Sequence, residues 1–145
     1  MPDPQRILAF DFGKRRIGTA LGNTLTQTAS PLQTLPCNHP EIPWRAIDAL
    51  IAEWSPGRLL LGLPQREDGT PGTLDKAIRD FAAALQKRYD TPVELVNEAF
   101  TSREAEARLK HQRQQGRKQK VKKSEIDQQA AAIIIEIWFK THGAA

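Results

Sequence analysis

The sequence contains one cysteine, Cys37, which excludes an intramolecular disulfide. Its three histidines are scattered and do not form a zinc-binding pattern with that cysteine, so any metal would be bound by oxygen atoms. The N-terminus lacks the features of a signal peptide, and no apolar run is long enough to cross a bilayer. With 145 residues, of which 39% are hydrophobic, we expect one cytoplasmic domain spanning residues 1–145, with no membrane partner.

Acidic residues are missing from one long stretch, between Glu106 and Glu125. Eight of the 21 Lys and Arg lie there, and the remaining 13 are outnumbered by 17 Asp and Glu, so the rest of the chain has a net charge of −4. A concentrated basic segment suits the phosphate backbone of a nucleic acid, where counterion release drives binding. A solvated loop is an equally good explanation of the charge alone. The eight residues are Arg108, Lys110, Arg113, Arg117, Lys118, Lys120, Lys122 and Lys123.

The first third of the chain predicts three antiparallel strands, over residues 7–12, 17–22 and 28–35. A turn at residues 13–16 joins the first two strands. Pro31 lies in the third strand, which predicts an edge position or a bulge. Small residues and glycines in the second strand permit a close approach of another backbone.

Helices and strands then alternate. Apolar residues at helical spacing predict helices over residues 44–54 and 74–89, and apolar runs predict strands over 59–63 and 92–98. A further helix can start at Thr101, followed by a last helix. We therefore predict an α/β fold: a mixed five-stranded sheet, with three antiparallel strands plus two parallel strands, flanked by helices.

The last helix is expected to begin with Ser124 as its N-cap. Its apolar face would comprise Ala130, Ala131, Ile134, Ile135 and Trp138. Asp127 shares that face at offsets of 4, 7 and 11 residues, so its side chain should point toward the sheet.

Three carboxylates occupy informative places in this arrangement. Asp11 interrupts the apolar first strand, Glu98 ends the fifth strand, and Asp127 lies near the start of the last helix. The carboxyl ends of neighbouring parallel strands meet at one edge of a sheet, where ligand sites gather. We expect Asp11 and Glu98 to converge there, with Asp127 facing them.

Each carboxylate also has a simpler interpretation. Asp11 could be a turn residue, Glu98 could precede or cap the next helix, and Asp127 could be a first-turn acid paired with Ser124. Only the three together favour a site. Clustered carboxylates repel one another unless divalent cations neutralise them, and oxygen ligands favour Mg²⁺ or Mn²⁺. Such ions activate water for in-line phosphoryl displacement, which makes phosphodiester hydrolysis the natural chemistry.

The motifs as a set resemble the YqgF/RuvX family. They comprise Ala9 to Gly13 with Ile17-Gly18, Leu61 to Pro64 with Asp68 to Thr70, Glu98 followed by Thr101 to Ala105, and Ile126-Asp127 before Ala130 to Ile135. The family is described as pre-16S rRNA nucleases and Holliday junction resolvase-like proteins with a ribonuclease H-like fold. The resemblance covers residues 7–139 and implies a catalytic, metal-binding site of Asp11, Glu98 and Asp127. It also implies a role in rRNA processing and ribosome biogenesis.

The chain departs from the family pattern in two places. Asn97-Glu98-Ala99 stands where the family usually has Asp-Glu-Arg, and Arg66 stands where the family has asparagine. Both changes bear on rate and substrate preference more than on the metal site, because Glu98 is retained.

The leading hypothesis is a metal-dependent nuclease that matures the 5′ end of pre-16S rRNA, with ribosomal precursor particles as partners. Its predicted nucleic-acid contacts are Lys14, Arg15, Arg16, Arg113, Arg117, Lys118, Lys120, Lys122 and Lys123. The alternatives are an endonuclease acting on branched DNA and an RNA-binding ribosome assembly factor without catalysis. The oligomeric state stays open, since a junction resolvase needs a two-fold dimer and rRNA trimming does not.

A nucleotide-binding hypothesis is weaker. The spacing of Asp11, Gly13 and Gly18 resembles the phosphate hairpin of sugar kinases and actin-like ATPases, which bind nucleotide between two lobes. This chain has the length for one lobe. The tripeptide Asp11-Phe12-Gly13 also occurs in protein kinases, but no glycine-rich loop precedes it and no catalytic loop is present.

Overall fold

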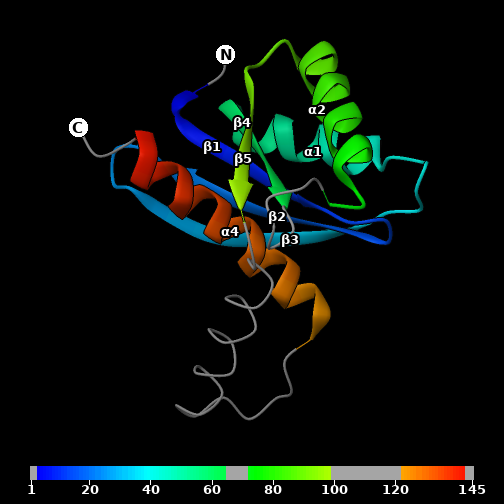
Figure 1. Ribbon diagram of the computed structural model, residues 1–145. Coiled ribbons are helices and arrows are strands. Elements are labelled where there is room, and N and C mark those ends of the chain that lie inside the picture. The colour runs from blue at the N-terminus through cyan, green and yellow to red at the C-terminus, as the bar shows by residue number, and fades with distance from the viewer. Residues whose placement is uncertain (1–2, 65–71, 99–121, 143–145) are drawn as a thin grey trace.

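A computed structural model describes residues 3–64, 72–98 and 122–142. Five strands form one sheet in the order β3-β2-β1-β4-β5 (Figure 1). Strands β1, β2 and β3 pair antiparallel, whereas β4 is parallel to both β1 and β5. The predicted mixed sheet is confirmed. The strands are β1 (Asp3–Phe12), β2 (Arg16–Asn23), β3 (Thr28–Pro36), β4 (Pro56–Pro64) and β5 (Val93–Glu98).

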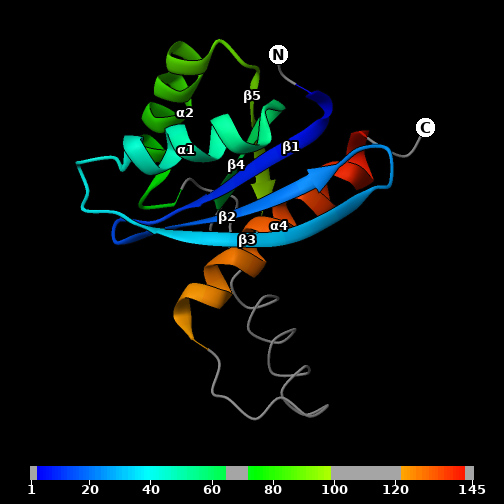
Figure 2. The same ribbon diagram turned by 180° about the vertical axis from the view of Figure 1, so that it is seen from behind.

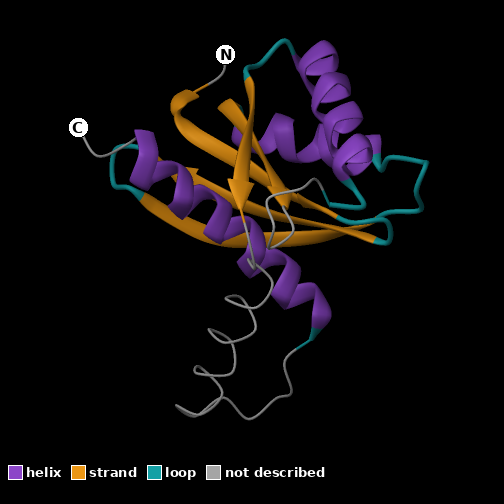
Figure 3. Ribbon diagram, viewed as in Figure 1, coloured by secondary structure: helices purple, strands orange, loops and turns teal. Residues whose placement is uncertain are grey.

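Helices cover both faces of the sheet. Helices α1 (Trp44–Trp54) and α2 (Asp75–Tyr89) pack on one face, and α4 (Lys123–His142) crosses the other (Figures 2 and 3). None of the described helices is long and apolar enough to cross a membrane. The helix predicted from Thr101 lies outside the described residues.

The strands bury side chains on both faces because helices cover both. In β1, Leu8 and Phe10 belong to the core under α1 and α2, while Ile7 and Ala9 pack against α4. In β4, the apolar run alternates in the same way, and Leu60 faces α4. The interpretation of this run as an internal parallel strand is confirmed.

Two local predictions are also confirmed. Strand β3 is an edge strand, and its register with β2 shifts between Gly18 and Ala20, where Ala20 pairs with Pro31. Proline has no N–H to donate to a ladder, and it is tolerated here because an edge strand pairs on one side only and the register is irregular at this point. Helix α1 ends at Ser55, whose backbone is left-handed and whose N–H donates to Ile51 O at 2.8 Å.

The start of α4 differs from the prediction. The helix begins at Lys123, one residue before Ser124, so Ser124 is not its N-cap. Instead, the carboxylate of Glu125 accepts a hydrogen bond from the backbone N–H of Lys122 at 3.4 Å. In a capping box, the side chain of the third helical residue accepts a hydrogen bond from the backbone N–H of the N-cap residue. Glu125 and Lys122 make this bond, so the N-cap position lies two residues before Ser124. The carbonyl of Ser124 serves tertiary packing, because it accepts a hydrogen bond from Thr34 Oγ1 at 2.6 Å.

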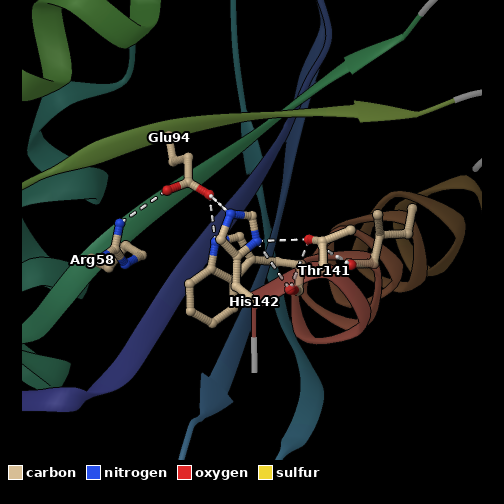
Figure 4. Close-up of polar contacts among 6 residues, drawn as sticks. Arg58, Glu94, Thr141 and His142 are labelled. Carbon is tan, nitrogen blue, oxygen red and sulfur yellow. Dashed lines mark hydrogen bonds and ion pairs between the residues drawn. The ribbon is translucent and has the colours of Figure 1, made fainter. Parts of the chain in front are cut away.

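The far end of α4 is anchored to the sheet through Glu94 of β5 (Figure 4). One carboxylate oxygen accepts from Arg58 of β4 at 3.1 Å, and the other accepts from Trp138 Nε1 and lies 3.4 Å from His142 Nε2. The rings of Trp138 and His142 stack with centroids 5.0 Å apart. These contacts fix the C-terminal turns of α4, and therefore the line along which its N-terminal turns approach the sheet.

Candidate active site

Two of the three predicted carboxylates line one pocket. Asp11 lies near the end of β1, and alternation along the strand puts it on the same face as Ala9, under α4. Asp127 enters from the second turn of α4. Both border an open cavity of about 430 Å³, together with the β1–β2 turn and the residues just before α2. Its lining residues are Asp11, Gly13, Lys14, Arg15, Arg16, Thr73, Leu74 and Asp127.

Asp127 points toward the sheet, as its position on the helix predicted. Arg16 Nε donates to Asp127 Oδ2 at 2.7 Å, and the two side chains are 39% and 20% exposed. The helix end is capped through Glu125, so Asp127 does not act as the capping acid. The carboxylate is instead held at the pocket by a residue 111 positions earlier in the chain.

The basic turn that borders the pocket is held through its backbone. The N–H of Cys37 donates to Arg15 O at 2.9 Å, and the N–H of His39 donates to Lys14 O at 3.1 Å. The side chains of Lys14 and Arg15 are exposed at the pocket. Backbone anchoring thus fixes where the turn lies, while two cationic side chains remain at the surface beside the carboxylates.

Glu98 is the last residue of β5, in register with Pro64 of β4. Strands β1, β4 and β5 run parallel, so their C-terminal ends lie together on the side of the sheet where Asp11 borders the pocket. The Glu98 side chain lies outside the described residues, as do the predicted contacts Arg113, Arg117, Lys118 and Lys120. Lys122 and Lys123 are described, and both are exposed at the start of α4.

The donor chemistry of the pocket fits a hard divalent cation. Within residues 3–64, 72–98 and 122–142, no three His, Cys, Asp or Glu side chains are grouped to hold a metal, and Asp11 and Asp127 are the described carboxylates of the pocket. Carboxylate oxygens are the ligands that Mg²⁺ and Mn²⁺ prefer, and Mg²⁺ is commonly held by one or two carboxylates plus water and substrate phosphates.

Sequence reasoning missed two residues of the pocket, Thr73 and Leu74. Leu74 was expected only as a core residue of the second helix, and it does pack against the core under α1 and α2. Nothing in the local pattern signals its second role, because the turn that it approaches is about 60 residues away in the sequence.

A protein-family model described as "RuvX: Holliday junction resolvase" matches residues 5–141. The chain belongs to the RuvX family. A protein of Dechloromonas aromatica named "Putative pre-16S rRNA nuclease" is 42% identical over 93% of this chain and 90% of that protein. One of the same name from Saccharophagus degradans is 37% identical, with 95% of each covered. The predicted family is confirmed, and this RuvX protein is a nuclease, a hydrolase of phosphodiester bonds.

Solved structures agree on the fold of this RuvX protein. RuvC of Thermus thermophilus in complex with a Holliday junction substrate superposes with a TM-score of 0.51 at 11% identity, covering 96% of this chain and 97% of that chain. The fowlpox virus Holliday junction resolvase has a TM-score of 0.52 at 13% identity, covering 94% and 98%. The predicted ribonuclease H-like fold, shared with resolvases, is confirmed.

Proposed function

We propose that this RuvX-family nuclease is metal-dependent and matures the 5′ end of pre-16S rRNA, as one domain spanning residues 1–145. One observation carries the proposal. Asp11 and Asp127, 116 positions apart in the sequence, line a single pocket whose rim carries the basic turn of β1 and β2. Metal-dependent hydrolysis of a phosphodiester needs carboxylates that hold a divalent metal ion. It is also helped by basic side chains nearby that bind the phosphates of the substrate.

The residues of the site would have three roles. Asp11, Asp127 and Glu98 would hold Mg²⁺ or Mn²⁺, which supplies Lewis-acid stabilisation of the phosphate and a water of lowered pKa. Lys14 and Arg15 would bind phosphates flanking the cleaved bond. Arg16 would hold Asp127 in place and contact phosphate.

The proposed substrate rests on two further supports. The relatives that share 37–42% of their residues with this chain carry the name of a pre-16S rRNA nuclease. The segment containing Arg113, Arg117, Lys118, Lys120, Lys122 and Lys123 supplies the positive charge for a long phosphate backbone. Ribosomal precursor particles would be the physiological partners.

The test is cleavage of a 16S rRNA precursor with a 5′ extension by purified protein, in the presence and absence of Mg²⁺. Asp11→Asn keeps the size of the side chain and removes its charge, and we expect it to lower the cleavage rate at least about 1,000-fold. Asp80→Asn is the matched control, since Asp80 is exposed on α2, away from the pocket, and forms an ion pair with Lys76 of the same helix. It should cleave like the wild type.

Cleavage that is equal in wild type and Asp11→Asn, or that is unaffected by removal of divalent metal, would refute the proposed mechanism. RNA binding without any cleavage would support a non-catalytic assembly factor.

A second substrate is favoured by one observation, the description of the matching family model as a Holliday junction resolvase. A four-way DNA junction, assayed beside the rRNA precursor with the same two variants, separates the two. If the junction is cleaved faster than the rRNA precursor, and if this cleavage is lost in Asp11→Asn, then branched DNA is the substrate and the proposed metal-dependent hydrolysis still holds.

A further inference from the structure

One residue of β2, Gly18, lies between the two described carboxylates. In the β1–β2 ladder Gly18 pairs directly with Asp11. On the face that α4 covers, a Cβ atom added to Gly18 would lie 2.1 Å from the carbonyl oxygen of Asp127 and 2.8 Å from its Cβ. These distances are far inside van der Waals contact, so only a hydrogen atom fits between this strand and the helix.

We propose that Gly18 is a positioning residue that sets the separation between Asp11 and Asp127. Its cross-strand partner is one carboxylate and its neighbour across the helix–sheet interface is the other. The contact is with the backbone of α4, which cannot turn aside as a side chain can. A methyl group at Gly18 would therefore lift the first turns of α4 from the sheet and carry Asp127 away from Asp11. The consequence for metal binding rests on the proposed function.

Contacts on both sides of Gly18 hold the helix close. Thr34 Oγ1 of β3 donates to Ser124 O at 2.6 Å and accepts from Gln128 Nε2 at 3.2 Å. On the other side, Arg16 Nε donates to Asp127. The first turns of α4 are thus drawn onto β2 and β3, and Gly18 fixes how near they come.

Gly22 provides a matched control within the same strand. A Cβ added there would lie 2.8 Å from Cγ2 of Ile135, a side-chain atom of the same helix. Ile135 is eight residues beyond Asp127, or about 12 Å along the helix. Gly22→Ala therefore adds the same methyl group beneath α4, away from the carboxylates and against a side chain instead of backbone.

The experiment compares full-length wild type with Gly18→Ala, Gly22→Ala and Thr34→Val. Mn²⁺ binding is measured by electron paramagnetic resonance, folding by thermal unfolding, and the position of Asp127 by a crystal structure of Gly18→Ala. We expect Gly18→Ala to weaken Mn²⁺ binding about 10- to 100-fold, as loss of a supporting contact does, and Gly22→Ala to change it less than about twofold. Both glycine variants should lose thermal stability.

Gly18→Ala that binds Mn²⁺ like the wild type, or a crystal structure in which Asp127 keeps its distance from Asp11, overturns the proposal. If Gly18→Ala does not fold, Thr34→Val decides, because it loosens the same turn without adding volume. Weaker Mn²⁺ binding by Thr34→Val supports the proposal and unchanged binding overturns it. If the wild type binds no Mn²⁺, the proposed function fails, and the crystal structure of Gly18→Ala still tests the positioning role.

Discussion

Among single residues, Arg16 connects the structural and the functional parts of the pocket. Its guanidinium pairs with Asp127 at 2.7 Å, yet 39% of the side chain remains exposed on the pocket rim. A charge-assisted hydrogen bond of this kind orients the carboxylate. The guanidinium has five donors, and the Nε bond to Asp127 uses one of them, so phosphate can be bound through the others.

Replacing Arg16 with Gln should weaken nucleic-acid binding and lower the slope of log affinity against log salt by about 1, because one phosphate contact is lost. Binding of a labelled rRNA precursor at several salt concentrations measures the slope. Arg45→Gln makes the same charge change on α1, which packs on the opposite face of the sheet, and should leave the slope unchanged. An equal decrease in both variants would show that Arg16 acts only through net charge.

Among the elements, α1 and α2 are joined by a polar clamp at the surface. Arg88 donates two hydrogen bonds to Asp48, at 3.0 and 2.8 Å, and Tyr89 donates a third at 2.6 Å. The guanidinium also lies over the ring of Trp44, 4.8 Å from its centroid. The clamp joins α1 to the C-terminal turn of α2, the end of that helix opposite to the pocket.

Acid should weaken this clamp. The Arg88 guanidinium, with help from the Tyr89 hydroxyl, lowers the pKa of Asp48 from 3.8 to about 2. A carboxyl group whose pKa is lower in the folded than in the unfolded protein stabilises the fold at pH values above the unfolded-state pKa. For Asp48 this stabilisation is lost as the pH falls from about 4 through about 2. Asp48→Asn should therefore unfold at a lower temperature than wild type at pH 6, and the difference should shrink between pH 4 and pH 2.

Thermal unfolding of both proteins across that range is the measurement. In Asp80→Asn the lost ion pair, with Lys76, is an exposed one within α2, so this variant should keep the wild-type midpoint at pH 6. A difference between wild type and Asp48→Asn that stays constant down to pH 2 would contradict the role of the clamp.

On the scale of the whole molecule, charge is separated along the chain. The stretch between Glu106 and Glu125 carries eight cations, while the rest has a net charge of −4. The described end of this stretch, Lys122 and Lys123, leads directly into the helix that carries Asp127. A nucleic acid attracted by the basic stretch would therefore be held next to the pocket instead of over the acidic remainder.

Replacing Lys118, Lys120, Lys122 and Lys123 with Gln should lower the salt slope for a single-stranded RNA by about 3, because each phosphate contact contributes about 0.7. Replacing three exposed lysines outside the stretch, Lys76, Lys87 and Lys140, is the control and should change the slope little. Fluorescence anisotropy with a labelled RNA measures both. Equal losses would indicate a diffuse charge effect.

The sequence by itself determined the elements and their buried faces, because period-2 and period-3.6 patterns are local consequences of strand and helix geometry. The mixed sheet, the internal strand β4, the edge position of Pro31 and the inward direction of Asp127 all followed from such patterns. The start of α4 was predicted two residues too late, because Glu125 accepts from the backbone N–H of Lys122 and so caps the helix ahead of Ser124.

Only the tertiary structure decided how the pocket is assembled. The pairing of Gly18 with Asp11, the contact of Gly18 with Asp127, and the approach of Thr73 and Leu74 join segments that are distant in sequence. No local pattern encodes these distances, since they depend on the line along which α4 crosses the sheet. That line is set by packing at both ends of the helix, by Glu94 at one end and by Gly18 at the other.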